Sequence, residues 1–379
     1  MRGRSWPPRA PEGGHTGHLD DASGLLVTPR GRRLCLEVAF ASDERLWAPV
    51  LDASRAFGPS GTRFSSFGHG APRRPPAPTP VAEAARAVAG LDASALAAVL
   101  ADDTRMLACL ERTVGATAYW QPPYPEDLLL ATPELCAALA PVAQAIEAAG
   151  LLVRWAAPAA TRQWRVEFDT DATDASWPGD PASALADWRE RRVEAEQRAA
   201  AWNRRHPRKP LSGVWWSCPL DAPLTSGAFA GVPCGLALVE DEFGWERALV
   251  TATAGTGRVL ELDRDTWVEL CRRFPLEVTQ TSRAVWGWTT GREGAWVIPD
   301  WAAVAREWDA VHLPVGQYLL LAGDVIEVDA GAASLVAGWG PDVTVWLADR
   351  VRAWAAPARW ARADSGTSGE PWVRVPPQD

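Results

Sequence analysis

The stretch Arg283–Leu321, RAVWGWTTGREGAWVIPDWAAVAREWDAVHLPVGQYLLL, has the clearest local pattern in this sequence. Asp300 precedes a short apolar-periodic run, which predicts the N-cap of a helix. The apolar residues of that run recur at helical spacing, so one face of the helix is apolar: Trp301, Val304, Ala305 and Trp308. Residues 296–298 before the helix and 310–313 after it each predict a short strand. The second strand places His312 at a strand end, where sites often lie.

The composition limits the classes of function. A chain of 379 residues predicts two or three domains, each large enough for its own core. The net charge of −9 disfavours broad electrostatic binding to nucleic acid. The 22 tryptophans are unusual, and the simplest interpretation of most of them is core packing.

The scattered cysteines, together with the lack of a signal-peptide-like apolar segment, predict a reducing compartment. The six cysteines are scattered, with no C-x-x-C pair, which argues against a zinc site: Cys35, Cys109, Cys136, Cys218, Cys234 and Cys271. The first residues lack the apolar core of a signal peptide, and no apolar run reaches the length of a membrane span. We therefore expect a cytoplasmic protein with reduced thiols and no membrane association.

The first half of the chain predicts a mixed α+β domain. Residues 1–31 are rich in Pro, Gly and Arg and are expected to be disordered, and the domain is expected over residues 32–170. Arg33–Ala41 (RLCLEVAFA) predicts a strand. Helices are expected between residues 81 and 114 and from Thr132–Pro133 to Gly150. The runs LLVRWAA and TRQWRVEFD, over residues 151–169, predict a hairpin.

The second half predicts an α+β domain with a mainly antiparallel sheet and few short helices. A long helix from Pro181 to Arg205 is expected to connect the domains over residues 181–208. Short apolar runs across residues 209–350 predict many strands, with a capped helix at Asp263–Phe274. The run 254–257 predicts a hairpin turn, and residues 351–379 are expected to be a disordered tail.

Four segments of the second half occur in a recognisable order: Lys209–Ser217 (KPLSGVWWS), Phe243–Glu246 (FGWE), Pro299–Leu313 (PDWAAVAREWDAVHL) and Gly338–Leu347 (GWGPDVTVWL). Together they resemble an uncharacterised bacterial Trp-rich family, some members of which are distantly similar to mono-ADP-ribosyltransferases. The resemblance covers residues 209–347. The sequence departs from the family pattern at residues 308–310, which are Trp-Asp-Ala in place of Tyr-Asp-Gly. It also lacks an H-G-T strand upstream and a complete series of Arg, Ser-Thr-Ser and Glu-x-Glu in that order.

The resemblance implies an enzyme that takes NAD as substrate and cleaves its nicotinamide–ribose bond. Such a reaction passes through an oxocarbenium-like state that a carboxylate stabilises, while aromatic faces stack the nicotinamide. The implied catalytic residues are Glu240, Glu242, Ser217 and His312. The implied NAD-binding residues are Trp215, Trp216, Trp245 and Tyr318.

The alternative is a non-catalytic protein that binds a protein partner or a small molecule. The sequence contains no G-x-G-x-x-G, H-E-x-x-H or G-x-S-x-G motif, and tryptophan is enriched at interface hot spots. The two hypotheses differ in what they require of the structure. The enzyme needs acids and aromatic faces in one deep cleft, and the binding protein needs exposed tryptophans on a flat patch.

Overall fold

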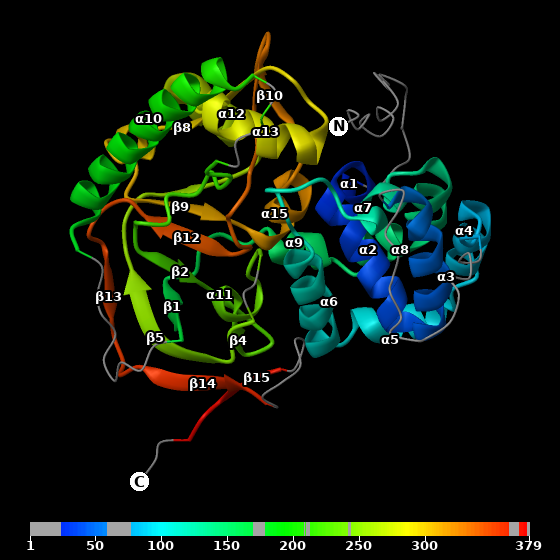
Figure 1. The fold of residues 1–379 in the computed structure, drawn as a ribbon. Helices are drawn as coiled ribbons and strands as arrows, with labels where there is room; N and C mark the ends of the chain where they lie inside the picture. The colour runs from blue at the N-terminus through cyan, green and yellow to red at the C-terminus, as the bar shows by residue number, and fades with distance from the viewer. Residues whose placement is uncertain are drawn as a thin grey trace, which may run out of the picture.

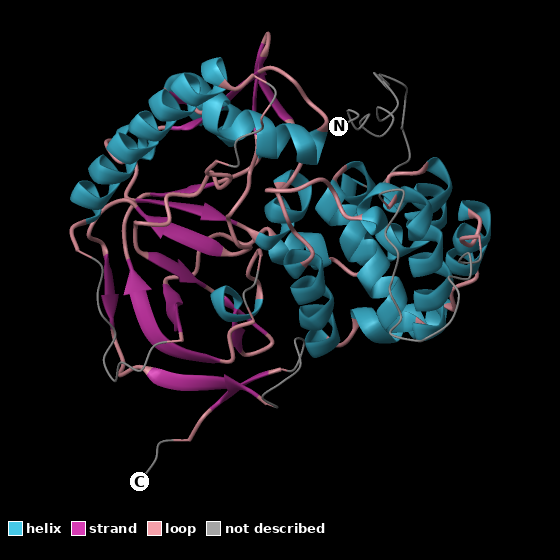
Figure 2. Cartoon of the chain, viewed as in Figure 1, coloured by secondary structure: helices cyan, strands magenta, loops and turns pink. Residues whose placement is uncertain are grey.

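Helices occupy the first part of the chain and strands dominate the second, as Figure 1 and Figure 2 show. A computed structural model describes residues 24–58, 77–169, 179–207, 209, 213–241, 244–363 and 371–376. The predicted α+β class is confirmed. We call the elements α1–α9 the helical half and everything from strand β1 onward the sheet half.

The helical half is built around α2 (Pro29–Ser42), which contacts α1, α5, α6, α7 and α8. The other helices of this half are α1 (Gly24–Val27), η1 (Glu44–Leu46), α3 (Trp47–Ser54), η2 (Arg55–Phe57), α4 (Val81–Ala89), α5 (Ala93–Leu100), α6 (Asp103–Gly115), α7 (Pro125–Leu130), α8 (Pro133–Ala148) and α9 (Leu151–Trp155). As predicted, Thr132 caps α8, and Gly150 follows its end with a left-handed φ of 68°.

Two strand predictions in this half are wrong. Residues 33–41 belong to α2, which begins with Thr28 as N-cap and Pro29 in the first turn. Because α2 is buried on almost every side, its apolar residues fit a strand pattern as well as a helical one. Residues 151–155 form α9 instead of the first strand of a hairpin. Residues 24–27 and 29–31 are helical, while residues 1–23 lie outside the described part.

The sheet half contains a nine-stranded sheet in the order β15-β14-β5-β1-β2-β12-β9-β6, with β13 also paired to β5. Its strands are β1 (Arg162–Phe168), β2 (Leu224–Ser226), β5 (Arg247–Gly255), β6 (Val259–Glu261), β9 (Ala310–Leu313), β12 (Val343–Trp346), β13 (Val351–Ala353), β14 (Ala358–Arg362) and β15 (Trp372–Arg374). All pairs in this sheet are antiparallel except β6 with β9.

The part of this half that the structure describes also contains two smaller sheets. A four-stranded sheet has the order β10-β11-β8-β7, and a two-stranded sheet pairs β3 with β4. Their strands are β3 (Ala228–Phe229), β4 (Val232–Pro233), β7 (Pro275–Glu277), β8 (Ala295–Pro299), β10 (Ile326–Asp329) and β11 (Ala332–Ser334).

The pairing of the large sheet corrects three expectations. Strand β1, which we assigned to the first domain, lies between β5 and β2 of the second. The tail expected from residue 351 onward contains β13, β14 and β15. The run 254–257 is not a hairpin turn, because β5 and β6 pair with different strands of the sheet.

Among the described residues of the sheet half there are six helices: α10 (Pro181–Arg205), α11 (Cys234–Ala237), α12 (Arg264–Arg273), α13 (Thr279–Thr290), α14 (Trp301–Val304) and α15 (Val315–Leu321). The predicted caps at Asp263 and Asp300 are confirmed, since each side chain accepts a backbone N–H of the first helical turn. Helix α13 was not predicted. Helix α10 has the predicted bounds and packs against α13 and α14.

Tryptophans fill the core of the sheet half. Trp267, Trp286, Trp296, Trp301 and Trp339 are each completely buried. The rings of Trp301 and Trp339 lie 5.3 Å apart at an edge-on angle, a favourable aromatic geometry. The stretch Arg283–Leu321 is therefore mainly a scaffold: its strands β8 and β9, its helices α14 and α15 and its tryptophans together build this core.

In the described part of the chain, no helix combines the length and the apolar character needed to cross a bilayer.

Candidate functional site

The carboxyl group of Glu240 and the hydroxyl of Tyr318 meet at the junction between the two halves. Glu240 follows α11, and Tyr318 lies on α15. The Tyr318 hydroxyl donates to Glu240 Oε1 at 2.8 Å, and the Gly338 amide donates to Glu240 Oε2 at 2.5 Å. Tyr318 is fully buried and Glu240 is 9% exposed. Both carboxyl oxygens of Glu240 are therefore engaged inside the protein.

The helical half contributes a second set of polar groups to this junction. Arg30 on α2 is buried and donates to Asp127 Oδ2 at 2.9 Å and to the Thr113 carbonyl at 3.0 Å. Tyr119, which follows α6, is also buried. Its hydroxyl lies close to Glu240 and Tyr318 but makes no hydrogen bond of normal geometry with the described residues. We call Arg30, Tyr119, Glu240 and Tyr318 the junction cluster.

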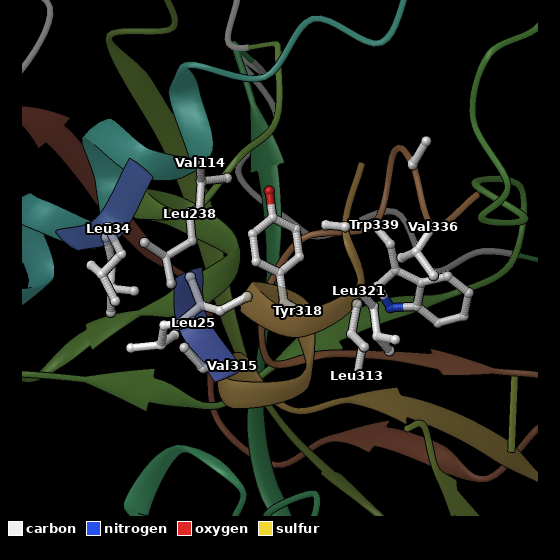
Figure 3. Packing of buried hydrophobic residues seen from close by; sticks show 14 of the residues in the cluster. Leu25, Leu34, Val114, Leu238, Leu313, Val315, Tyr318, Leu321, Val336 and Trp339 are labelled. Carbon is white, nitrogen blue, oxygen red and sulfur yellow. The ribbon is translucent and has the colours of Figure 1, made fainter. Parts of the chain in front are cut away.

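Hydrophobic side chains from both halves enclose the junction cluster. Figure 3 shows Tyr318 among buried residues that include Leu34 and Val114 from the helical half and Leu313 and Trp339 from the sheet half. At the edge of the cluster, the Trp120 indole N–H donates to Asp241 Oδ2 at 3.1 Å and so joins the halves at the surface. The cluster is thus part of the packing that holds the halves together.

Burial dominates the electrostatics of the junction cluster. It raises the pKa of Glu240 to about 7, although the hydrogen bonds from Tyr318 and Gly338 oppose this rise by favouring the carboxylate. The charge of Arg30 opposes it as well. Burial and the nearby Glu240 charge also raise the pKa of Tyr119 and Tyr318. Glu240 can therefore gain or lose a proton near neutral pH, a property common among acid–base groups of enzymes.

Three more predicted site residues lie beside the junction cluster. The Trp215 ring is 6.1 Å from Tyr119 and 5.8 Å from Trp216, measured between ring centroids. A Cβ atom on Gly338 would come within 2.3 Å of Trp216 Cβ, so glycine is required there for close approach. Ser217 is buried and exchanges hydrogen bonds with the backbone of Ala337, next to Gly338.

His312 lies elsewhere, inside a separate set of charges that we call the histidine cluster. Its Nδ1 is 2.5 Å from Glu261 Oε2, and its Nε2 is 3.0 Å from Asp342 Oδ1. Glu261 is opposite His312 in the pairing of β6 with β9, and Asp342 directly precedes β12. Burial by itself would lower the pKa of His312, but the two carboxylates outweigh it and raise the pKa to about 9. The imidazole is therefore a buried cation between two anions.

Of the remaining two predicted residues, Trp245 lies apart from the junction cluster. Trp245 stacks on Phe168 of β1, with ring centroids 4.2 Å apart. Glu242 lies outside the described residues. The structure thus brings together Glu240, Tyr318, Trp215, Trp216 and Ser217 but separates His312 and Trp245 from them, because different strands and loops carry these residues.

Sequence reasoning missed several residues of both clusters. Arg30 and Tyr119 come from the helical half, which the family resemblance did not cover. The Thr28–Pro29 helix start was a signal that would have placed Arg30 on a helix. The partners of His312 depend on strand pairing between distant segments, and no local signal revealed them.

The helical half contains a surface groove of about 560 Å³. Helices α4, α5 and α8 form its walls, and every lining residue is apolar. The larger side chains are Val88, Leu91, Leu96, Leu100, Pro141 and Val142, and alanines supply the remainder. Its volume falls in the range of about 300–1,000 Å³ that is usual for ligand sites.

Within the described ranges, no group of three or more His, Cys, Asp or Glu side chains is arranged to hold a metal ion. In the histidine cluster, hydrogen bonds to Glu261 and Asp342 occupy both imidazole nitrogens.

Comparisons with protein-family models, with curated proteins and with solved structures found no match to this chain. The resemblance to the Trp-rich family stays a prediction.

Proposed function

We propose that this chain is a binding protein that holds an apolar segment of another protein in the groove of its helical half. The observation that carries the proposal is the lining of this groove, which contains apolar residues only. Alanines such as Ala97 and Ala145 form much of its wall and leave room for the side chains of a partner. Grooves lined mainly by apolar side chains are common binding sites on proteins.

The state of the candidate catalytic residues also supports binding over chemistry. Hydrogen bonds inside the protein engage the Glu240 carboxyl group and both His312 nitrogens. A substrate has to reach a catalytic group directly or through one water. The buried Tyr318 and the nearly buried Glu240 offer no such access in this conformation.

The test uses two neighbouring alanines of α5. Ala97 lines the groove and Ala98 does not, and both are exposed. Glutamine is a good helix former, so Ala97→Gln and Ala98→Gln change the helix equally while only the first fills the groove. Partner capture from a lysate of the source cells should be lost with Ala97→Gln and retained with Ala98→Gln. Equal capture by both variants would contradict the proposal.

A second candidate function is the NAD-consuming activity implied by the resemblance. One observation favours it: a carboxyl group with a pKa of about 7, next to Tyr318 and close to Trp215 and Trp216. The test follows nicotinamide release from NAD. Wild-type protein should release nicotinamide, Glu240→Gln should not, and Glu246→Gln, at an exposed acid, should behave as wild type. Absence of release by the wild type would remove this candidate.

A further inference from the structure

Arg192 occupies a core position of α10. The buried residues of this helix follow helical spacing and form one packed stripe: Pro181, Leu185, Trp188, Arg192, Ala199 and Asn203. Helix α10 packs against α13 and α14 of the sheet half (Figure 1). An apolar side chain is expected at residue 192, because a buried charge costs free energy unless it is paired. Departures of this kind from the core pattern are expected at functional sites.

The end of the Arg192 side chain has no acceptor within the described part of the chain. Arg192 is 6% exposed, and its Nη1 and Nη2 atoms are buried without a hydrogen-bond partner there. Trp188 lies four residues earlier, on the same face of α10, and its indole N–H is buried without a partner as well. Two neighbouring side chains of one helix thus hold donor groups in the interior with no acceptor for them.

The other buried arginines of the described chain are paired with acids. Arg30 donates to the Asp127 carboxylate at 2.9 Å, and Arg362 donates to the Glu111 carboxylate at 2.6 Å. Such pairing offsets the cost of removing a guanidinium from water. Arg192 is equally buried and lacks this compensation among the described residues.

The acids that flank Arg192 along α10 have other partners. Glu196, whose charge acts on Arg192, accepts hydrogen bonds through both carboxylate oxygens from residues 280–281 at the start of α13. On the other side, Arg189 pairs with Asp300, the N-cap of α14, at 2.6 Å. Among the described residues, the positive charge of Arg192 is therefore left without a carboxylate of its own.

We infer that Arg192 and Trp188 bind an oxyanion, the carboxylate or phosphate group of a small molecule. A guanidinium can donate two parallel hydrogen bonds to such a group, and the indole N–H supplies a third. A neutral ligand would leave the charge of Arg192 unpaired, and a cation would be repelled. The site belongs to the sheet half and is independent of the apolar groove, so the inference does not rest on the proposed function.

Entry of the oxyanion requires a local opening. The terminal nitrogens of Arg192 have no contact with solvent in this conformation, so the packing of α10 has to loosen before the anion reaches them. Once the anion is bound, the low dielectric of the interior strengthens its hydrogen bonds.

Anion-dependent stabilisation tests the inference. Full-length protein is titrated with sodium phosphate or sodium acetate at constant ionic strength, with chloride as the balancing anion, and Tm is measured. A ligand that binds only the folded state raises Tm as its concentration increases. Phosphate, acetate or both should raise the Tm of the wild type, and the anion that does so identifies the chemical class. No rise with either anion overturns the inference.

Four variants assign the effect to this site. Arg192→Met removes the donors and should abolish the rise in Tm, whereas Arg191→Met, at the exposed neighbour that pairs with Asp221, should keep it. Trp188→Phe keeps an aromatic ring without the N–H and should raise the Kd of the anion about tenfold. Arg192→Lys keeps the charge without the planar fork, so it should bind more weakly than the wild type and more tightly than Arg192→Met.

An equal rise in Tm for the wild type and Arg192→Met overturns the inference, because the anion then acts elsewhere. Circular dichroism checks that each variant is folded. If Arg192→Met fails to fold, Trp188→Phe and Arg192→Lys decide, and a Kd that neither of them changes overturns the inference as well.

Discussion

The junction cluster and the histidine cluster bury an ionisable side chain in opposite ways. Glu240 meets neutral donors, the Tyr318 hydroxyl and the Gly338 amide, so burial prevails and its pKa rises toward the neutral form. His312 meets two carboxylates, so charge prevails over burial and its pKa rises toward the charged form. The same direction of shift thus has opposite physical causes, and the difference lies in the charge of the partners.

Removing the buried cation should have the largest effect. His312→Ala leaves Glu261 and Asp342 facing each other without a cation, and we expect a loss of about 3–5 kcal/mol in the free energy of unfolding. Urea denaturation measures this loss. The triple variant Glu261→Gln, His312→Gln, Asp342→Asn removes all three charges together and should lose less. A loss below about 1 kcal/mol for His312→Ala would mean that the ions are solvated.

The contributions of Glu240 and His312 to the free energy of unfolding should be lost in successive pH ranges. Glu240 has a folded pKa of about 7 against an ordinary value of 4.5, so the folded state binds its proton more tightly and stability falls as pH rises between these values. His312 has a folded pKa of about 9 against 6.5, so its contribution is complete below 6.5 and disappears as pH rises to about 9.

Each of these losses should be about 3 kcal/mol. Urea denaturation from about pH 4 to about pH 10 should show both decreases in the free energy of unfolding. Glu240→Gln should flatten the lower decline only, and His312→Gln the upper one only. A single variant that flattens both would show that the two clusters titrate together.

A smaller effect should follow when one hydrogen bond of Glu240 is removed. Tyr318→Phe takes away the hydroxyl that donates to Glu240, and we expect a loss of about 2 kcal/mol because the acceptor stays buried. The pKa of Glu240 should rise further, which carbon-13 NMR of the carboxyl group detects. Tyr124→Phe, at an exposed tyrosine, is the matched control and should change neither quantity.

Arg192 is a third buried charged side chain, and its substitution should have the smallest effect on the free energy of unfolding. Arg192 on α10 is 6% exposed, and its terminal nitrogens have no hydrogen-bond partner among the described residues. Burial lowers its pKa to about 10. Arg192→Met should therefore raise the free energy of unfolding by about 1 kcal/mol. Arg191→Met, at the exposed neighbour that pairs with Asp221, should change stability little, and a loss with Arg192→Met would contradict the expectation.

Local signals predicted the elements whose ends are marked by caps. The Thr132 and Asp263 caps located α8 and α12, and the favourable charge spacing located α10. The strand predicted at residues 33–41 was wrong because α2 is buried on nearly every side, so its apolar pattern has no single period. The position of β1 depends on β5 and β2, which come much later in the chain, and no local pattern encodes that pairing.

The candidate site was predictable only in part, for a related reason. Residue type alone singled out Glu240, Tyr318 and Trp215, and the fold brings them together. Tyr119 and Arg30 approach them from the helical half by long-range packing. The two ion pairs of His312 likewise follow from the order of β6, β9 and β12 in the sheet. The groove was not predicted, because a run of alanines indicates a helix but does not show which face of that helix stays uncovered in the fold.

The place of β1 in the large sheet affects how the chain folds during synthesis. The helical half leaves the ribosome before the sheet half, and most contacts between its helices lie within it. Strand β1 follows directly but stays without partners until β2 and β5 have been made, and β5 gains β14 only after residues 358–362 have been made. The nascent protein therefore carries unpaired strand edges during synthesis, a condition that favours chaperone binding and aggregation.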